Sequence, residues 1–293
     1  MRYSKKILYI LKLLRVNNYI KNLIIFLPVF FGKSLFDVNN LLVTLYGFIN
    51  FCLVTSVVYV INDIKDLEKD KKHPKKCKRP IASGKISIKV AFIILAFLII
   101  IACSMCVIGI IKKIYNIEVV LLMLAYIIIN LLYSFCFKKF PIVDIFIIAI
   151  GFMLRLYIGS YISNIEISSW LYLTILGGSF YMALGKRRSE LTQNKSNSTR
   201  EVLGKYNYDF LDKNMTISMA FTEMSYALWA VSNENKYMYL TVPIMLFILM
   251  RYMYIIEINE NAENPVDIII TDKILVSIVT IFVLITVILL YVI

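Results

Sequence analysis

Long hydrophobic runs separated by short polar connections dominate this chain of 293 residues. A helix of about 20 apolar residues crosses a hydrocarbon core of roughly 30 Å, and nine such runs can be laid out along the sequence. The predicted spans are 20–36, 41–61, 89–111, 117–136, 140–162, 167–185, 214–231, 237–256 and 272–292. Pro28, Gly32 and Lys33 interrupt the first, which favours a broken or partly re-entrant helix there. The pattern predicts an all-α, polytopic membrane protein.

The segment before the first span has a different pattern. Its isoleucines and leucines fall on one helical face, and its lysines and Arg15 lie elsewhere. Helices of this kind lie in the membrane interface. We therefore expect an interfacial amphipathic helix over 1–19 and a transmembrane domain over 20–293.

Composition supports the membrane interpretation, since 60% of the residues are hydrophobic. The net charge of +13 raises the question of nucleic acid, but the basic residues follow topology. The N-terminus and every second loop carry 27 of the 32 lysines and arginines. The positive-inside rule places that side in the cytoplasm. We expect an integral protein of a bacterial or archaeal plasma membrane, with a cytoplasmic N-terminus and no nucleic-acid partner.

Two loops on the basic side, 62–89 and 186–213, are long and charged, whereas almost every other connection is short. They follow the second and the sixth predicted spans. Polar loops at corresponding positions of two halves of a membrane protein often meet over a common cavity. We expect both loops to be cytoplasmic and to cap a central cavity that opens to that side.

The first loop begins with a cluster of acids. Asp63, Asp66 and Asp70 are spaced by three and four residues, so a helix turns them to one side, and Asn62 joins that face. Hard oxygen ligands of this kind suit Mg²⁺, which is commonly shared with substrate phosphates. The alternative is that these acids only pair with neighbouring lysines in a solvated loop.

A basic stretch follows the acids directly. It contains Lys75 and Arg79, within the sequence HPKKCKRP. Cations beside an aspartate-bound Mg²⁺ suit a diphosphate, whose charge has to be neutralised as it leaves. Lys75 and Arg79 are therefore candidate substrate ligands.

The motif Asn62-Asp63…Asp66…Asp70 after the second hydrophobic run, followed by HP and RP, resembles the UbiA superfamily of intramembrane prenyltransferases. That resemblance implies a bundle of nine helices which binds a polyprenyl diphosphate through Mg²⁺ at two aspartate-rich motifs. The second motif departs from the pattern. The corresponding segment, 184–206, reads LGKRRSELTQNKSNSTREVLGKY and is basic.

This basic loop, IKNLIIFLPVFF at 20–31 and further segments resemble one branch of the superfamily, the decaprenyl-phosphate phosphoribosyltransferases. The resemblance implies Mg²⁺-dependent transfer of 5-phosphoribosyl from phosphoribosyl diphosphate to a polyprenyl phosphate, for a cell-wall or glycan precursor. The acids would then hold Mg²⁺ on the diphosphate, and the second loop would hold the 5-phosphate. Its candidate ligands are Lys186, Arg187, Arg188 and Arg200.

The lipid phosphate needs a partner of its own. Arg155 lies inside a predicted span, where a charge is costly and by default functional, with Asp144 on nearly the same face. The alternative is that Arg155 only fixes helix packing by pairing with Asp144 or Glu223. Further candidates for the lipid phosphate or the cavity lining are Lys138, Lys139 and Tyr133.

Three other functions stay open. An aromatic prenyltransferase would use a polyprenyl diphosphate, but it would be expected to carry aspartates in the second loop. A lipid transporter would move its substrate without turnover, and a non-catalytic membrane subunit would bind no phosphoribosyl diphosphate. The sequence is compatible with a homo-oligomer and fixes neither the oligomeric state nor the length of the lipid.

Overall fold

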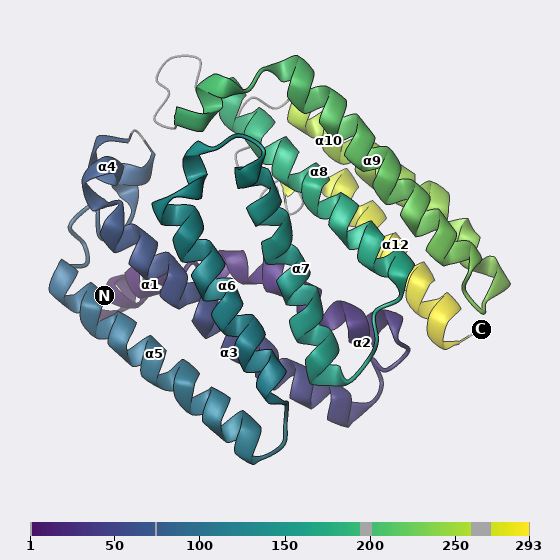
Figure 1. Ribbon diagram of the computed structural model, residues 1–293, viewed down its shortest axis with the longest axis horizontal. Helices are drawn as coiled ribbons and strands as arrows, with labels where there is room; N and C mark the ends of the chain where they lie inside the picture. Colours follow the sequence, from purple (N-terminus) through teal and green to yellow (C-terminus); the bar gives the residue numbers. More distant parts are fainter. Residues whose placement is uncertain (1, 74, 194–200, 259–270, 293) are drawn as a thin grey trace. The chain divides into compact units, whose positions relative to one another are not determined.

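The computed structural model describes residues 2–73, 75–193, 201–258 and 271–292 (Figure 1). Every regular element in these ranges is a helix, which confirms the predicted all-α class. The chain divides into two compact units, Met1–Phe135 with Leu154–Ile165, and Cys136–Met153 with Glu166–Ile293. Helix α7, Val143–Ser163, contributes residues to both units.

The first unit is built around the long helix α3. Besides the second half of α7, its elements are α1 (Arg2–Leu14), η1 (Val16–Phe26), α2 (Leu27–Phe31), α3 (Val38–Lys65), α4 (Leu67–Lys72), η2 (Lys76–Lys78), α5 (Ile88–Ile111) and α6 (Ile117–Phe135). Helices α3 and α5 lie side by side (Figure 1). Asp37 caps α3 by accepting from two backbone N–H groups. The predicted interruption of the first span is confirmed, because a 3₁₀ helix precedes Pro28 and α2 ends at Phe31, just before Gly32.

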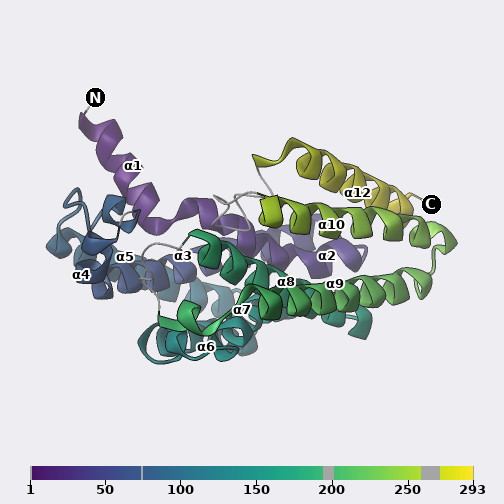
Figure 2. The ribbon, with the colours of Figure 1, turned by 90° about the horizontal axis from the view of Figure 1, so that it is seen from above.

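The first helix presents apolar side chains to the outside. Ile7, Leu8 and Leu11 are exposed, whereas Leu13 is buried against α3. Figure 2 shows α1 leaving the rest of its unit at an angle. An exposed apolar face on a basic helix supports the interfacial location, which stays a prediction.

A close backbone approach holds α7 against η1 in the first unit. An ideal Cβ at Gly159 would lie 2.1 Å from the carbonyl oxygen of Ile25. Small residues allow this kind of approach between membrane helices. The position therefore requires glycine for its lack of a side chain.

We expect Gly159→Ala to lower the stability of the protein by about 1–3 kcal/mol, because a backbone carbonyl cannot move aside as a flexible side chain can. Thermal melting of the purified protein in detergent measures the effect. Gly178→Ala is the control, since its Cβ would meet only a methyl group of Thr222, at 3.8 Å. Equal melting temperatures for the two variants would show that the approach is not tight.

The second unit contains two helix pairs. Besides the first half of α7, its elements are η3 (Phe137–Lys139), α8 (Ser169–Gln193), η4 (Glu201–Lys205), α9 (Tyr208–Val231), η5 (Lys236–Thr241), α10 (Val242–Ile258) and α12 (Lys273–Tyr291). Helices α8 and α9 run together, and α12 lies beside α10 (Figures 1 and 2). Tyr181, Leu211, Met215 and Tyr252 belong to the core between them.

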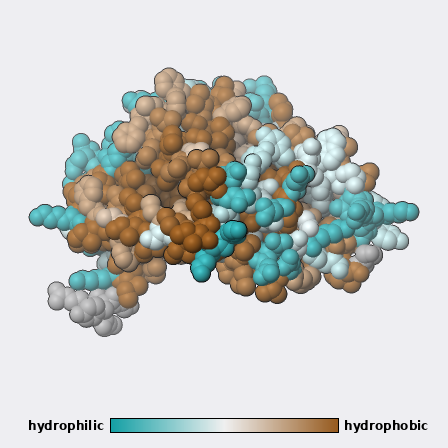
Figure 3. Space-filling model, turned by 60° about the horizontal axis from the view of Figure 1, so that its bottom comes forward, coloured by the Kyte–Doolittle hydropathy of each residue, from teal (hydrophilic) through white to brown (hydrophobic). Residues whose placement is uncertain are grey.

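Six described helices are long and apolar enough to cross a membrane: α3, α5, α6, α7, the segment Lys236–Ile258 and α12. Helices α8 and α9 are long but more polar, and Val16–Phe31 is shorter. Large apolar side chains are exposed along α5, and hydrophobic residues spread over much of the face drawn in Figure 3. The membrane character is thereby supported, whereas the count of nine spans and the central cavity remain predictions.

Candidate functional site

The acidic segment, residues 62–70, spans the junction between α3 and α4. Asp66 is the single residue between the two helices. Its backbone N–H donates to the carbonyl of Asn62 at 2.9 Å, and its own carbonyl accepts from Asp70 N–H at 2.8 Å. The helical path is therefore nearly continuous, which keeps residues 63 and 70 on one side.

Arg79 joins the first and last of the predicted aspartates. Its Nη1 lies 3.1 Å from Asp63 Oδ1 and 2.6 Å from Asp70 Oδ2. Both carboxylates are buried, with exposed fractions of 2% and 4%. Burial raises the pKa of the Asp70 carboxyl, and the Arg79 guanidinium counteracts part of that rise. The structure thus brings three predicted site residues together, with both buried carboxylates bound to an arginine.

A second guanidinium, that of Arg15, also binds Asp63. Arg15 follows α1 and lies over the ring of Tyr59, with 4.8 Å between its Cζ and the ring centroid. Sequence reasoning placed Arg15 on the polar face of an interfacial helix and did not include it in the site. The only signal was that it is an arginine in a segment rich in lysine.

Asp66, the third predicted aspartate, does not form a preformed metal-binding group with the other two. No three acidic, histidine or cysteine side chains in the described part of the chain form a group that could hold a metal ion. Asp66 is half-buried and departs from helical geometry, with φ −88° and ψ 9°. Two arginines meanwhile hold the carboxylates of Asp63 and Asp70. A metal site that joins Asp63, Asp66 and Asp70 stays a prediction.

Asn62 has an oxygen suited to a cation. Its Oδ1 is buried and has no hydrogen-bond partner among the described residues. An unpaired buried carbonyl costs about 1–3 kcal/mol, and amide and carboxylate oxygens are ligands for Mg²⁺. Asn62, Asp63 and Asp70 therefore fit a hard divalent cation by the chemistry of their donor atoms.

The rest of the first loop is more exposed. Lys75 lies at the surface, and its backbone N–H donates to Nδ1 of His73 at 3.2 Å. Glu68 forms an exposed pair with Lys71, which lowers the pKa of the glutamate through their hydrogen bond. These contacts describe a turn and a solvated ion pair.

The end of α6 approaches the end of α3. Lys65 Nζ donates to the carbonyl of Ser134 at 2.7 Å and lies 3.4 Å from the centroid of the Phe135 ring. Tyr133, half-buried in the same turn of α6, is therefore close to the beginning of the acidic segment. This supports its choice as a residue near the site.

The second loop begins with a buried network in the second unit. Arg187 is 0% exposed, and its Nε lies 2.5 Å from Asp144 Oδ2. Arg187 also pairs with Glu190. The hydroxyl of Tyr206 donates to Asp144 Oδ1 at 2.7 Å, and burial together with this bond raises the pKa of the phenol. Two predicted substrate ligands, Asp144 and Arg187, are thus an internal ion pair.

The other cations of this region differ in accessibility. Arg188 is paired with Asp212 and also donates to the carbonyl of Ile256 at 3.1 Å. Lys186 and Lys138 are half-buried, and Lys139 is exposed. Near the last of these, Lys205 Nζ lies 3.5 Å from the Lys139 carbonyl. Arg200 lies outside the described residues.

Arg155 is buried in the first unit. Its Nε donates to Asn22 Oδ1 at 2.9 Å and its Nη2 to the Tyr126 hydroxyl at 3.0 Å. The guanidinium also lies over the rings of Phe51 and Tyr126. A pair with Asp144 or Glu223 was the alternative to a substrate role, and Asp144 binds Arg187. These neutral and aromatic partners favour the packing interpretation over a direct substrate contact.

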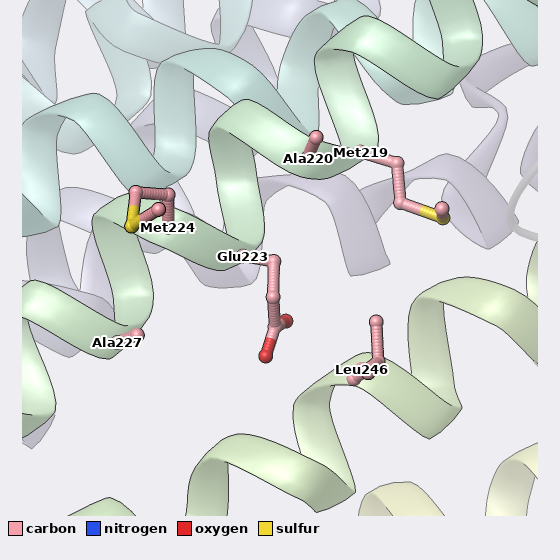
Figure 4. A pocket seen from close by; sticks show the side chains of 6 residues that line it. All are labelled: Met219, Ala220, Glu223, Met224, Ala227 and Leu246. Atoms are coloured by element: carbon pink, nitrogen blue, oxygen red, sulfur yellow. The ribbon is translucent and has the colours of Figure 1, made fainter.

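Glu223 faces a cavity of about 400 Å³ between α9 and α10 (Figure 4). Both of its carboxyl oxygens are buried and have no hydrogen-bond partner among the described residues. The cavity is lined by Met219, Ala220, Glu223, Met224, Ala227 and Leu246.

The sequence is similar to those of known enzymes. Residues 23–266 match the model of the UbiA prenyltransferase family. The chain is 29% identical to a decaprenyl-phosphate phosphoribosyltransferase of Corynebacterium glutamicum, over 90% of this chain and 81% of the relative. It is 27% identical to the enzyme of that name from Mycobacterium tuberculosis, over 91% of this chain and 89% of the relative.

The fold is similar to that of a UbiA homolog from Archaeoglobus fulgidus bound to GPP and Mg²⁺, with a TM-score of 0.68 and 20% identity over 96% of each chain. That likeness concerns the fold. The family model covers most of the sequence, and the predicted resemblance is confirmed. The chain belongs to the UbiA prenyltransferase family.

Proposed function

We propose that this protein transfers 5-phosphoribosyl from phosphoribosyl diphosphate to a polyprenyl phosphate and releases diphosphate. The cluster of Arg79 with the buried carboxylates of Asp63 and Asp70 carries the proposal, because it combines carboxylates for a divalent cation with a cation for a diphosphate. The relatives named decaprenyl-phosphate phosphoribosyltransferase support it over most of the chain. The basic second loop, which has few aspartates, supports it further.

The diphosphate of the donor would bind at this cluster. Asn62, Asp63 and Asp70 would hold Mg²⁺, with Asp66 as a neighbouring carboxylate. When bound, Mg²⁺ neutralises negative charge on the diphosphate. Arg79, whose side chain is partly exposed, would donate to diphosphate oxygens and stabilise the charge that develops as they leave.

The reaction then needs no protein base. The bond between C1 of the ribose and the diphosphate oxygen breaks, and its electron pair leaves with the diphosphate. C1 acquires oxocarbenium character, and an oxygen of the lipid phosphate forms the new bond to C1. That oxygen is already ionised at neutral pH.

The other two phosphates, the ribose 5-phosphate and the lipid phosphate, require cations. Burial of Arg187 and pairing of Arg188 with Asp212 favour an anchoring role for these arginines. Lys186 and the lysines of η3, Lys138 and Lys139, are then better candidates for phosphate contacts. Arg200 remains a candidate from its position in the sequence.

The apolar helices and the charge pattern support a location of the protein in the membrane with its site on the cytoplasmic side. The excess of lysine and arginine on one set of loops supports a cytoplasmic site, where phosphoribosyl diphosphate is soluble and accessible. The lipid phosphate would approach from the bilayer.

The donor assignment can be tested with purified protein in nanodiscs. With Mg²⁺ and a polyprenyl phosphate, labelled phosphoribosyl diphosphate should yield a labelled lipid, detected by thin-layer chromatography and mass spectrometry. A polyprenyl diphosphate with an aromatic acid should yield no product, because the second loop lacks a second aspartate-rich site.

The reverse result would support an aromatic prenyltransferase. Movement of lipid across vesicles without chemical change would support a transporter. Reactions without Mg²⁺, or with chelator, serve as controls and should give no labelled lipid.

A further inference from the structure

We propose that Arg15 is a positioning residue that couples cation binding to diphosphate binding at Asp63. Arg15 disfavours a divalent cation alone and favours the cation together with a diphosphate. The inference rests on the proposed function, since it concerns the diphosphate end of the same site.

The N-terminal segment is built to fix Arg15 in place. The Leu14 carbonyl accepts from Ser56 Oγ at 3.1 Å, and Ser56 Oγ lies 2.7 Å from the Tyr19 hydroxyl. Between these two anchors Arg15 has φ 54° and ψ 47°, the left-handed conformation. Residues other than glycine adopt it rarely and keep it only where surrounding contacts enforce it.

The anchored backbone directs the guanidinium to Asp63. The side chain of Arg15 is 25% exposed, whereas that of Asp63 is 2% exposed. Tyr59 supports the guanidinium from one side. A guanidinium carries five N–H donors in a planar fork, so Arg15 can bind Asp63 and still offer donors to an anion from solvent.

The charges of the cluster decide what binds. Two carboxylates, Asp63 and Asp70, are matched by two guanidiniums, Arg15 and Arg79. A divalent cation alone adds positive charge beside both arginines, which is unfavourable. A diphosphate group brings roughly three negative charges at neutral pH and gives both arginines a new partner. Removal of the Arg15 guanidinium should therefore raise the affinity for a divalent cation alone and lower the affinity for a diphosphate.

The test uses the full-length protein in nanodiscs and two binding titrations. Mn²⁺ alone, and inorganic diphosphate at saturating Mn²⁺, are followed by electron paramagnetic resonance. Arg15→Asn removes the charge, while asparagine tolerates positive φ better than most residues. We expect Mn²⁺ alone to bind about tenfold more tightly and diphosphate about tenfold more weakly than in the wild type.

Two further variants separate charge from position. Lys12→Ala removes an exposed positive charge from α1 and should leave both affinities unchanged. Arg15→Lys keeps the charge without the fork, so it should retain the weak affinity for Mn²⁺ alone and lose part of the affinity for diphosphate. If Arg15→Asn proves unstable, the diphosphate affinity of Arg15→Lys still tests the role of the guanidinium.

Unchanged affinities in Arg15→Asn, or changes of the same sign for both ligands, would overturn the inference and leave the proposed function intact. A wild-type protein that binds no diphosphate in the presence of Mn²⁺ would overturn both the inference on Arg15 and the proposed function. A wild-type protein that binds it, with opposite shifts in the variant, supports both.

Discussion

Asp63→Asn and Asp70→Asn are each expected to lower turnover by at least about a hundred- to thousandfold. Each change removes one of the two buried carboxylates that Arg79 joins and leaves the guanidiniums in excess. The site then loses a ligand for the divalent cation and repels it. Product formation from phosphoribosyl diphosphate measures the loss, and size-exclusion chromatography checks that the protein stays folded.

Two neighbouring acids provide controls in the same segment. Glu68→Gln should retain nearly full turnover, because Glu68 is exposed and forms an ion pair with Lys71 at the surface. Asp66→Asn should have an effect between these extremes, since Asp66 is half-buried, whereas Asp63 and Asp70 are buried and bound to Arg79. Full turnover in Asp63→Asn would remove the cation site from the mechanism. A complete loss in Asp66→Asn would support the three-aspartate set expected from the sequence.

Arg187→Met should destabilise the protein by about 3–5 kcal/mol, because it leaves the carboxylate of Asp144 buried without its ionic partner. The Tyr206 hydrogen bond to Asp144 remains but cannot replace a full charge. Thermal melting in detergent should show the change. The double variant Arg187→Met with Asp144→Leu should recover much of the loss, since replacing both partners with apolar groups removes the unpaired charge.

Lys186→Ala is the matched control for this prediction. It changes the adjacent residue, which is only half-buried, and should leave the melting temperature nearly unchanged while raising the KM for phosphoribosyl diphosphate. If Arg187→Met instead melted like the wild type and raised that KM, Arg187 would be a phosphate ligand, as its sequence position first indicated.

Local spacing explains which parts of the site could be predicted. Asp63, Asp70 and Arg79 are close in sequence, and helical periodicity alone brings the two acids to one side. The long hydrophobic runs likewise predict most of the helices. Spans 167–185 and 214–231 were also predicted, but α8 and α9 are not among the six most apolar helices described, because serine, threonine, glycine and charged residues lower their apolar character.

Contacts between distant parts of the chain could not be predicted from the pattern. Arg15 binds Asp63, 48 residues away, and Arg187 binds Asp144, 43 residues away. From the sequence, Arg15 was interpreted as a membrane-surface residue and Arg187 as a phosphate ligand, because the pattern along a chain does not show which carboxylate a guanidinium contacts. Arg155 illustrates the same limit, because the sequence offered a substrate or an acid as its partner, and its contacts include a neutral amide and a phenol.

Mn²⁺ bound together with phosphoribosyl diphosphate should show phosphorus hyperfine coupling in pulsed electron paramagnetic resonance, because the diphosphate is expected to share the cation held by Asn62, Asp63 and Asp70. The coupling should vanish in Asp63→Asn and persist in Lys186→Ala. A wild-type signal without phosphorus coupling, or a coupling unchanged in Asp63→Asn, would contradict the assignment of this cluster to the diphosphate of the donor.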